Sequence, residues 1–290
     1  MFRALLQLAR PAHWPKNVFV LAPLVFAQRL HDGDAVARTL LAFLCFCAAS
    51  SVVYIFNDYR DREQDRRHPL KRLRPLAAGA VSAGIALAFA GSLLAATAAA
   101  AWWLGFGFMV VVLTYLLLNA LYSLWLKHVV ILDVMIVSMG FVLRVLGGGA
   151  AIAVEISAWL LLCTIFVALF LAFSKRRHEL ILLAGDAAEQ RRVLSHYSAS
   201  FLDQMINVVT ASSVVSYALY AISPETAERF DTRNLVYTIP FVLFGIFRYL
   251  YLMYQAPERL NPTEAVVRDW PSILNILLWA LVVVGIVYFF

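Results

Sequence analysis

Apolar residues in this chain are gathered into nine long runs separated by polar segments. A membrane-spanning helix needs roughly 20 mostly apolar residues. The pattern therefore predicts an all-α fold, a polytopic integral membrane helical bundle of about nine transmembrane helices. The runs are Val18–Leu30, Thr39–Phe56, Leu76–Ala100, Trp102–Tyr122, Val129–Val154, Ala158–Phe173, Asp203–Ile222, Leu235–Tyr254 and Ser272–Phe290.

Some features of this pattern are irregular. The first run is short and follows an amphipathic segment, Met1–Leu8, after which Pro11 and Pro15 interrupt any helix. The third and fourth runs nearly touch, and we place their junction near Ala101–Trp102. Gly147–Gly149 lies within the fifth run, where small residues favour close helix packing in lipid.

Composition agrees with a membrane protein. Of the 290 residues, 62% are hydrophobic and 14% are charged, whereas soluble domains average about half and a quarter. We expect one transmembrane domain, residues 1–290, with cytoplasmic loops near 57–75 and 174–202. Cys45, Cys47 and Cys163 lie within apolar runs, so we interpret them as buried, inert thiols.

Lysine and arginine are distributed unevenly among the connections. They are concentrated at the N-terminus and after the second and sixth runs, and few fall on the opposite side. Since cytoplasmic loops carry such an excess, these segments are predicted to be cytoplasmic. The inner membrane of a bacterium is the expected location.

Three carboxylates follow the second run with helical spacing. If that helix continues to Asp65, then Asp58, Asp61 and Asp65 share an arc of ~60° with Asn57 beside it, and Glu63 points away. Clustered carboxylates need a cation, and oxygen ligands favour Mg²⁺ shared with substrate phosphates. The alternative is a solvated loop whose charges only pair with one another and set the topology.

Basic residues surround this segment and predict a cradle for a diphosphate. Their alternative role is to set the topology. They are Arg66, Lys71 and Arg74, then Lys127 with Tyr122 nearby, and Lys175, Arg176 and Arg177 after the sixth run.

Two arginines, Arg144 and Arg248, lie inside apolar runs. Charge within the membrane usually marks a functional cavity or a partner. The alternative is a purely structural role, by snorkelling to the membrane surface or by pairing, with Asp133 as a candidate partner for either arginine. Asn119 and Asn207 are interpreted as hydrogen-bonding groups between helices.

The aspartate motif, Asn57-Asp58-x-x-Asp61-x-x-x-Asp65, resembles the first aspartate motif of the UbiA superfamily of intramembrane transferases. Further segments are similar to its decaprenyl-phosphate phosphoribosyltransferase branch, and the resemblance covers essentially the whole chain. They are the RPxxWxKN opening at Arg10–Asn17, the motif Asp65-Arg66-Arg67-His68-Pro69-x-Lys71-x-x-Arg74-Pro75, Lys175-Arg176-Arg177-x-Glu179-Leu180, and Asn261-Pro262-Thr263-Glu264.

This resemblance implies a Mg²⁺-dependent enzyme that moves 5-phosphoribose from 5-phosphoribosyl diphosphate to a polyprenyl phosphate and releases diphosphate. It implies that Asn57, Asp58, Asp61 and Asp65 hold the metal, the first three being catalytic. The substrates would be bound by Lys16, Asn17, Arg66, Lys71, Arg74, Tyr122, Lys127, Lys175, Arg176 and Arg177, with the basic residues at the phosphates. A homo-oligomer is compatible with the sequence, and no nucleic-acid partner is expected.

Other functions fit less well. Aromatic prenyltransferases of the superfamily, which use a polyprenyl diphosphate, carry a second DxxxD motif after the sixth run. This chain has Asp186 and Glu189 there, spaced three apart. That reading remains the alternative. Charge clustered on one rim argues against an anion transporter, and the Asp-Gly and Ala-Arg pairs of CDP-alcohol phosphotransferases are missing from the aspartate segment.

Overall fold

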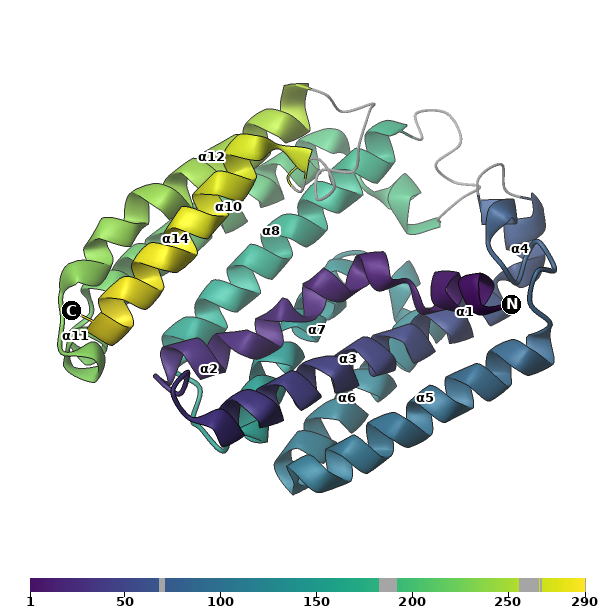
Figure 1. The fold of residues 1–290 in the computed structure, drawn as a ribbon. Coiled ribbons are helices and arrows are strands. Elements are labelled where there is room, and N and C mark those ends of the chain that lie inside the picture. Colours follow the sequence, from purple (N-terminus) through teal and green to yellow (C-terminus); the bar gives the residue numbers. More distant parts are fainter. Residues whose placement is uncertain (68–70, 183–191, 256–265, 267, 290) are drawn as a thin grey trace. The chain divides into compact units, whose positions relative to one another are not determined.

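A computed structural model describes residues 1–67, 71–182, 192–255, 266 and 268–289. Every regular element in these residues is a helix, as predicted (Figure 1). The chain forms two compact units. Unit 1 comprises Met1–Leu124 and Gly140–Ile156, and unit 2 comprises Trp125–Met139 and Ser157–Phe290.

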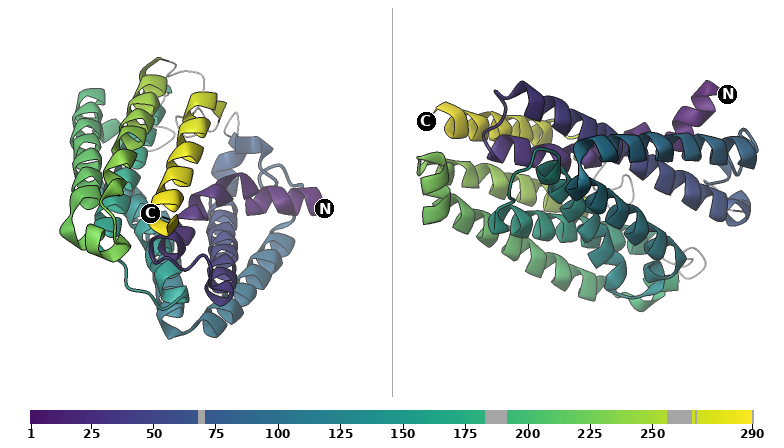
Figure 2. Two further views of the ribbon diagram at one scale, coloured as in Figure 1. Left: turned by 60° about the vertical axis from the view of Figure 1, so that its left-hand side comes forward. Right: turned by 90° about the horizontal axis from the view of Figure 1, so that it is seen from below.

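Unit 1 is built around the long helix α3. Helix α3 packs along α5, and the two views of Figure 2 show them side by side. Phe46, Phe108 and Tyr115 form the centre of its core, where the ring of Phe46 meets the other two edge-on. The elements are α1 (Phe2–Ala9), η1 (Pro11–Leu21), α2 (Ala22–Phe26), α3 (Gly33–Arg60), α4 (Arg62–Arg67), η2 (Lys71–Leu73), α5 (Ala83–Leu104), α6 (Phe106–Leu124) and the second part of α7 (Leu132–Ala151).

Unit 2 has its own core, in which Phe170, Leu202 and Ile206 are buried. Helix α8 packs along α10, and α12 packs against α14. The elements are η3 (Leu126–His128), the first part of α7, α8 (Ala158–Leu182), η4 (Arg192–His196), α10 (Ala199–Ile222), α11 (Pro224–Phe230), η5 (Asn234–Thr238), α12 (Ile239–Gln255) and α14 (Trp270–Phe289).

Within the described residues, eight helices are long and apolar enough to cross a membrane. The most apolar window of α5 has a mean hydropathy of 1.8, yet only 11% of it is buried in the protein. Apolar side chains such as Trp102 and Leu117 are exposed on α5 and α6. Surfaces of this kind require lipid around them rather than water.

The first of the predicted runs does not form a regular α-helix. Residues 11–21 form the 3₁₀-helix η1, which includes Pro15, and α2 adds only five residues. Proline lacks an N–H and clashes with the α-helical carbonyl four residues earlier, so a long α-helix cannot form there. A 3₁₀-helix is stretched, at about 2.0 Å per residue, so Pro11–Phe26 extends roughly 30 Å, close to the thickness of the hydrocarbon layer.

The junction between the third and fourth runs also differs from the prediction. Helix α5 continues through Trp102 and ends at Leu104, and α6 begins at Phe106. Gly105 between them has φ 114°, a conformation that residues with a side chain rarely adopt. The turn therefore lies at the glycine rather than at the Ala–Trp boundary.

The glycines of α7 pack closely, as predicted. A Cβ on Gly147 would lie 2.5 Å from the ring of Phe46, and one on Gly148 would lie 2.1 Å from the carbonyl oxygen of Val20. Both distances are far below van der Waals contact. The absence of a side chain at Gly148 therefore allows η1 to lie directly on α7.

Candidate active site

Two buried aspartates of unit 1 meet at one arginine. The guanidinium Nη1 of Arg74 donates to Asp58 Oδ1 at 3.1 Å and to Asp65 Oδ2 at 2.6 Å. Asp58 also accepts from Arg10 Nη2 at 2.5 Å. Since both carboxylates touch the same nitrogen, their oxygens lie within about 6 Å of each other. The two negative carboxylates therefore lie on the same positive group, the guanidinium of Arg74.

The local backbone brings these aspartates together differently from the prediction. Helix α3 ends at Arg60 and bends at Asp61, so the helix is not continuous to Asp65. The helical pattern of hydrogen bonds nevertheless persists across the bend, because Asp61 N–H bonds the carbonyl of Asn57 at 2.9 Å and Asp65 N–H bonds that of Asp61 at 2.8 Å. Asn57 and Asp61 are half-buried. Glu63 is exposed and bonds Arg66 instead, as its predicted direction requires.

The donor set suits Mg²⁺ that is shared with a ligand. Only oxygen atoms are offered, which is the preference of a hard cation. Among the described residues, no three His, Cys, Asp or Glu converge closely enough to hold a metal ion by themselves. Mg²⁺ commonly takes one or two carboxylates and completes its shell with substrate phosphates and water. Asp58 and Asp65 fit that second arrangement.

Arg10, the first residue of the Arg10–Asn17 motif, also lies at the candidate site and was not among the predicted binding residues. It ends α1 with φ 51°, in the left-handed region, and its guanidinium lies 5.0 Å from the ring centre of Tyr54. Ser51 Oγ anchors this corner by donating to the carbonyl of Ala9 at 2.8 Å. Backbone strain of this kind is concentrated at functional sites. The available signal was its place next to Pro11, which stops α1 there.

The other predicted substrate-binding residues of unit 1 lie on several elements. Lys16 in η1, Lys71 in η2 and Tyr122 in α6 are half-buried. Arg66 donates to both oxygens of Glu63 and to the carbonyl of Ala77. Their assignment to substrate phosphates stays a prediction.

Arg144 is bound in a way that the sequence did not predict. It donates to Asn17 Oδ1 at 2.7 Å, to the carbonyl of Gly140 at 2.6 Å and to the hydroxyl of Tyr115 at 3.0 Å. Asn17, which was expected to bind substrate, is fully buried. Asp133, the candidate partner of Arg144 or Arg248, pairs with neither. It binds Arg176 at 2.6 Å, and Arg248 binds Asp269 at 2.7 Å. Asn119 bonds within its own helix, to the carbonyl of Tyr115.

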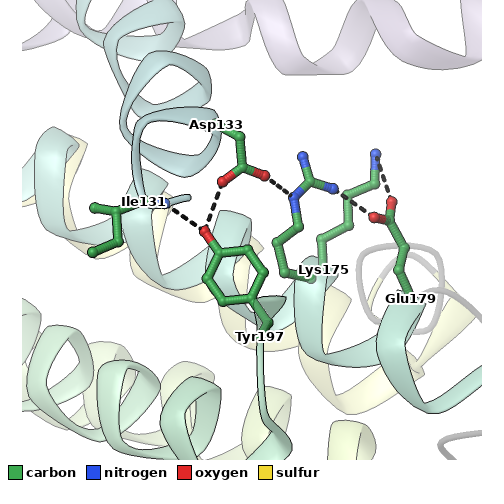
Figure 3. A network of polar contacts seen from close by, with 6 residues as sticks. Ile131, Asp133, Lys175, Glu179 and Tyr197 are labelled. Carbon is green, nitrogen blue, oxygen red and sulfur yellow. Dashed lines mark hydrogen bonds and ion pairs between the residues drawn. The ribbon is translucent and has the colours of Figure 1, made fainter. Parts of the chain in front are cut away.

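Asp133 is the centre of a polar network in unit 2 (Figure 3). Its Oδ2 accepts from Arg176 Nε at 2.6 Å, and its Oδ1 accepts from the hydroxyl of Tyr197 at 2.7 Å. That hydroxyl also accepts from the N–H of Ile131 at 2.7 Å. Burial, together with the hydrogen bond to Asp133, raises the pKa of Tyr197. The phenol therefore stays neutral and can keep donating to the carboxylate.

The basic cluster after α8's apolar part is extensively paired with acids. Arg176 also donates to Glu179 Oε2 at 2.5 Å, and Lys175 lies 3.7 Å from Glu179 Oε1. Arg177 Nε binds Asp203 at 2.5 Å, and its guanidinium lies 4.3 Å from the ring centre of Tyr254. Lys127 in η3 is half-buried. Phosphate binding by these residues remains a prediction.

Some predicted motif residues lie outside the described residues. They are His68 and Pro69, Asp186 and Glu189, and Asn261–Glu264. Of the cysteines, Cys45 and Cys47 are buried and Cys163 is half-buried, and all three are free thiols. Cys47 has one contact that was not expected, since its sulfur accepts from Asn17 Nδ2 at 3.2 Å.

Comparison with known proteins identifies the family of this chain. The UbiA prenyltransferase family matches residues 18–265. The chain is 37% identical over 256 residues to the decaprenyl-phosphate phosphoribosyltransferase of Mycolicibacterium smegmatis, which covers 84% of this chain and 80% of that protein. It is 32% identical over 243 residues to the protein of the same name from Mycobacterium tuberculosis, covering 82% and 80%.

Solved structures show the same fold. A UbiA homolog from Archaeoglobus fulgidus, bound to GPP and Mg²⁺, aligns with a TM-score of 0.73 at 18% identity, and the match covers 97% of this chain and 99% of that one. The chain belongs to the UbiA prenyltransferase family, and it is a multi-pass helical membrane protein.

Proposed function

We propose that this protein is a membrane phosphoribosyltransferase that moves 5-phosphoribose from 5-phosphoribosyl diphosphate to a polyprenyl phosphate of the decaprenyl type. The observation that carries the proposal is the 37% identity, over most of both chains, to a protein named decaprenyl-phosphate phosphoribosyltransferase. The charges around Asp58 support it, because arginines and carboxylates that meet at one point suit a diphosphate and its cation.

The polar residues around Asp58 and Asp65 have distinct proposed roles. Asp58 and Asp65, with Asn57 and Asp61, would hold Mg²⁺ together with the donor diphosphate, and the metal would neutralise charge that develops on the leaving group. Arg10 and Arg74 are already at the carboxylates and would bind the diphosphate oxygens. Lys16 and Lys71 would add positive charge for the remaining phosphates.

The chemistry is a single displacement at the ribose C1 carbon. An oxygen of the lipid phosphate forms a bond to C1 while the bond from C1 to the diphosphate oxygen breaks. The electron pair leaves with the diphosphate. Since the lipid phosphate is already ionised, no side chain has to remove a proton. The transition state resembles an oxocarbenium ion, so stabilisation of the departing negative charge by Arg10 and Arg74 supplies a large part of the rate enhancement.

We further propose that the site faces the cytoplasm, in the inner membrane of a bacterium. The support is the excess of lysine and arginine beside the aspartates and in the other long connections. Labelling of single cysteines tests this. A cysteine at Gln64 should react only after the membrane is opened, and one at Ala227 should react from outside intact cells.

The activity is tested with two pairs of substrates. Purified protein is incubated with labelled 5-phosphoribosyl diphosphate and polyprenyl phosphate, and separately with labelled polyprenyl diphosphate and 4-hydroxybenzoate. We expect label to enter lipid in the first reaction only, and only when Mg²⁺ is present. Transfer in the second reaction alone would identify an aromatic prenyltransferase and reject the proposal.

A further inference from the structure

Helix η1 has two rows of side chains with different surroundings, one buried against other helices and one that begins at Arg10. A 3₁₀-helix has about three residues per turn, so residues three apart lie on one face. One row consists of Trp14, Asn17 and Val20, of which the last two are fully buried. The next row consists of Arg10 at the start of the helix, His13 and Lys16. Arg10 binds Asp58, and the rings of His13 and Tyr54 are 5.3 Å apart.

The buried row fixes η1 against α3. Trp14 Nε1 donates to Ser51 Oγ at 3.2 Å, and Asn17 Nδ2 donates to Cys47 Sγ at 3.2 Å. Ser51 and Cys47 are four residues apart and so lie on one face of α3. The orientation of the Asn17 amide follows from its neighbours, since arginine can only donate and the amide oxygen must therefore point towards Arg144.

A second helix holds the same row from α7. Gly140, Arg144 and Gly148 are spaced by four and share a face of that helix. Arg144 binds Asn17, and Gly148 leaves room for the backbone of Val20. The Arg144 side chain and the close contact of Gly148 with the Val20 backbone thus hold neighbouring turns of η1 against α7.

Arg144 is a costly residue to use for this. The residue is 7% exposed, and every hydrogen-bond acceptor the structure gives it is neutral. The rings of Phe46, Tyr115 and Phe141 lie 4.9–5.9 Å from its guanidinium and stabilise the charge in part. A buried charge without an acidic partner is normally destabilising. Its presence within an apolar run therefore indicates a function.

We propose that Arg144 is a positioning residue that acts through Asn17. It fixes the rotation of η1, so that the second row keeps its contacts with α3, from Arg10 to Asp58 and from His13 to the ring of Tyr54. A slip of one residue would turn a 3₁₀-helix by about 120° and move that row away. Asn17 is a part of this lock and does not contact the substrate. The inference rests on the proposed function for its kinetic test only.

The kinetic test uses Arg144→Gln, Asn17→Ala and their double mutant. We expect each single substitution to lower kcat/KM for 5-phosphoribosyl diphosphate by roughly 10- to 100-fold, the scale of a small misplacement of a binding group. The double mutant should have about the same kcat/KM as the less active of the two single mutants, because both substitutions remove the same interaction. Independent multiplication of the two effects would overturn the coupling.

Asn17→Asp separates positioning from substrate contact. A carboxylate can still accept from Arg144 Nε, so this variant should recover most of the kcat/KM that Asn17→Ala loses. If Asn17 touched a substrate phosphate, the new negative charge would repel it and Asn17→Asp would be the worst of the variants. That result would reject the positioning role. Since Asn17→Asp and Asn17→Ala leave Arg144 in place, they remain informative if Arg144→Gln fails to fold.

The matched control is Arg38→Gln. Arg38 also supports unit 1 through backbone carbonyls, those of Ala151 at 2.7 Å and Leu104 at 3.0 Å, but it lies 20 residues before Asp58 on α3, roughly 30 Å along the helix. It should lower the melting temperature and leave KM unchanged. Equal kinetic effects of Arg38→Gln and Arg144→Gln would mean that Arg144 is merely structural.

The position of η1 can also be tested without measuring enzyme activity, by the reactivity of a cysteine placed at Lys16. Lys16→Cys is combined with Arg144→Gln or with Arg38→Gln, and the rate of thiol labelling is compared, with the unsubstituted protein as background. We expect a several-fold change only in combination with Arg144→Gln. Unchanged labelling would reject the inference, even if the enzyme proves to use another donor.

Discussion

The hydroxyl of Tyr197 donates to the buried carboxylate of Asp133 at 2.7 Å, across 64 positions of the sequence. The other oxygen of that carboxylate binds Arg176, so one aspartate joins the start of α7, the end of α8 and the residue that precedes α10's cap. Removing any member leaves a buried polar group without its partner.

Tyr197→Phe tests this network with the loss of a single oxygen. Because Asp133 is fully buried, we expect a loss of about 1–3 kcal/mol in the free energy of unfolding. Tyr254→Phe is the matched control, since its hydroxyl bonds Asp203, whose side chain is 33% exposed and can turn to water. Thermal unfolding in detergent measures both. An equal loss in the two variants would contradict the role of burial.

Arg176→Ala and Arg177→Ala should differ strongly. Arg176 and Asp133 are an almost fully buried ion pair, and removing one partner of such a pair costs about 3–5 kcal/mol. Arg177 pairs with the more exposed Asp203, so its loss should cost about 1 kcal/mol or less. Denaturation curves of both variants check the order. A higher KM for 5-phosphoribosyl diphosphate in a folded Arg177→Ala protein would support the phosphate role predicted from the sequence.

The aspartates of unit 1 should be needed for activity. We expect Asp58→Asn and Asp65→Asn to lower kcat/KM by roughly 10²- to 10³-fold, because each removes charge from the place where the cation and diphosphate would bind. Glu63→Gln, on the same segment but exposed and bonded to Arg66, should retain activity. The assay is a Mg²⁺ titration with thermal stability recorded in parallel. Near-normal turnover in Asp58→Asn would refute the metal assignment.

Gly148→Ala should destabilise the protein and reduce activity together. Its methyl group would lie 2.1 Å from the carbonyl oxygen of Val20, so η1 must shift away from α7. Overpacking of this kind costs about 1–3 kcal/mol. Gly91→Ala in α5 is the control, because nothing lies within 4 Å of its added methyl group. Unfolding and kcat/KM are measured for both, and a harmless Gly148→Ala would show that η1 can move freely.

The pair of Arg248 and Asp269 gives a prediction for pH. Hydrogen bonds from Arg248 and then from Ser272 hold the pKa of Asp269 well below its usual range. A lowered pKa in the folded state contributes stability that is present above the ordinary value of about 3.9 and is lost as the pH falls further. The stability difference between the native protein and Asp269→Asn should be constant from about pH 8 to 5 and begin to close below about pH 4. A difference that widens in acid would contradict this.

The sequence by itself determined the membrane helices and pointed to the segment of the candidate site. Long apolar runs specify helices in lipid, because the backbone must satisfy its hydrogen bonds locally there. The spacing of Asp58, Asp61 and Asp65 predicted that these carboxylates act together, and in the structure Asp58 and Asp65 both bind Arg74. The apolar runs and the aspartate spacing are both patterns among residues close together in the sequence, so they can be recognised without the tertiary structure.

Only the tertiary structure decided which distant residues satisfy one another. The bond between Arg144 and Asn17 joins residues 127 positions apart. Asp133 binds Arg176, and not Arg144 or Arg248 as the sequence had suggested. Proline in η1 excluded a regular α-helix, but the packing of Asn17 and Val20 on α3 and α7 fixed which face is buried. A buried charge or amide can be satisfied by many groups of the right chemistry, and the one that serves is set by the distance and direction that packing imposes.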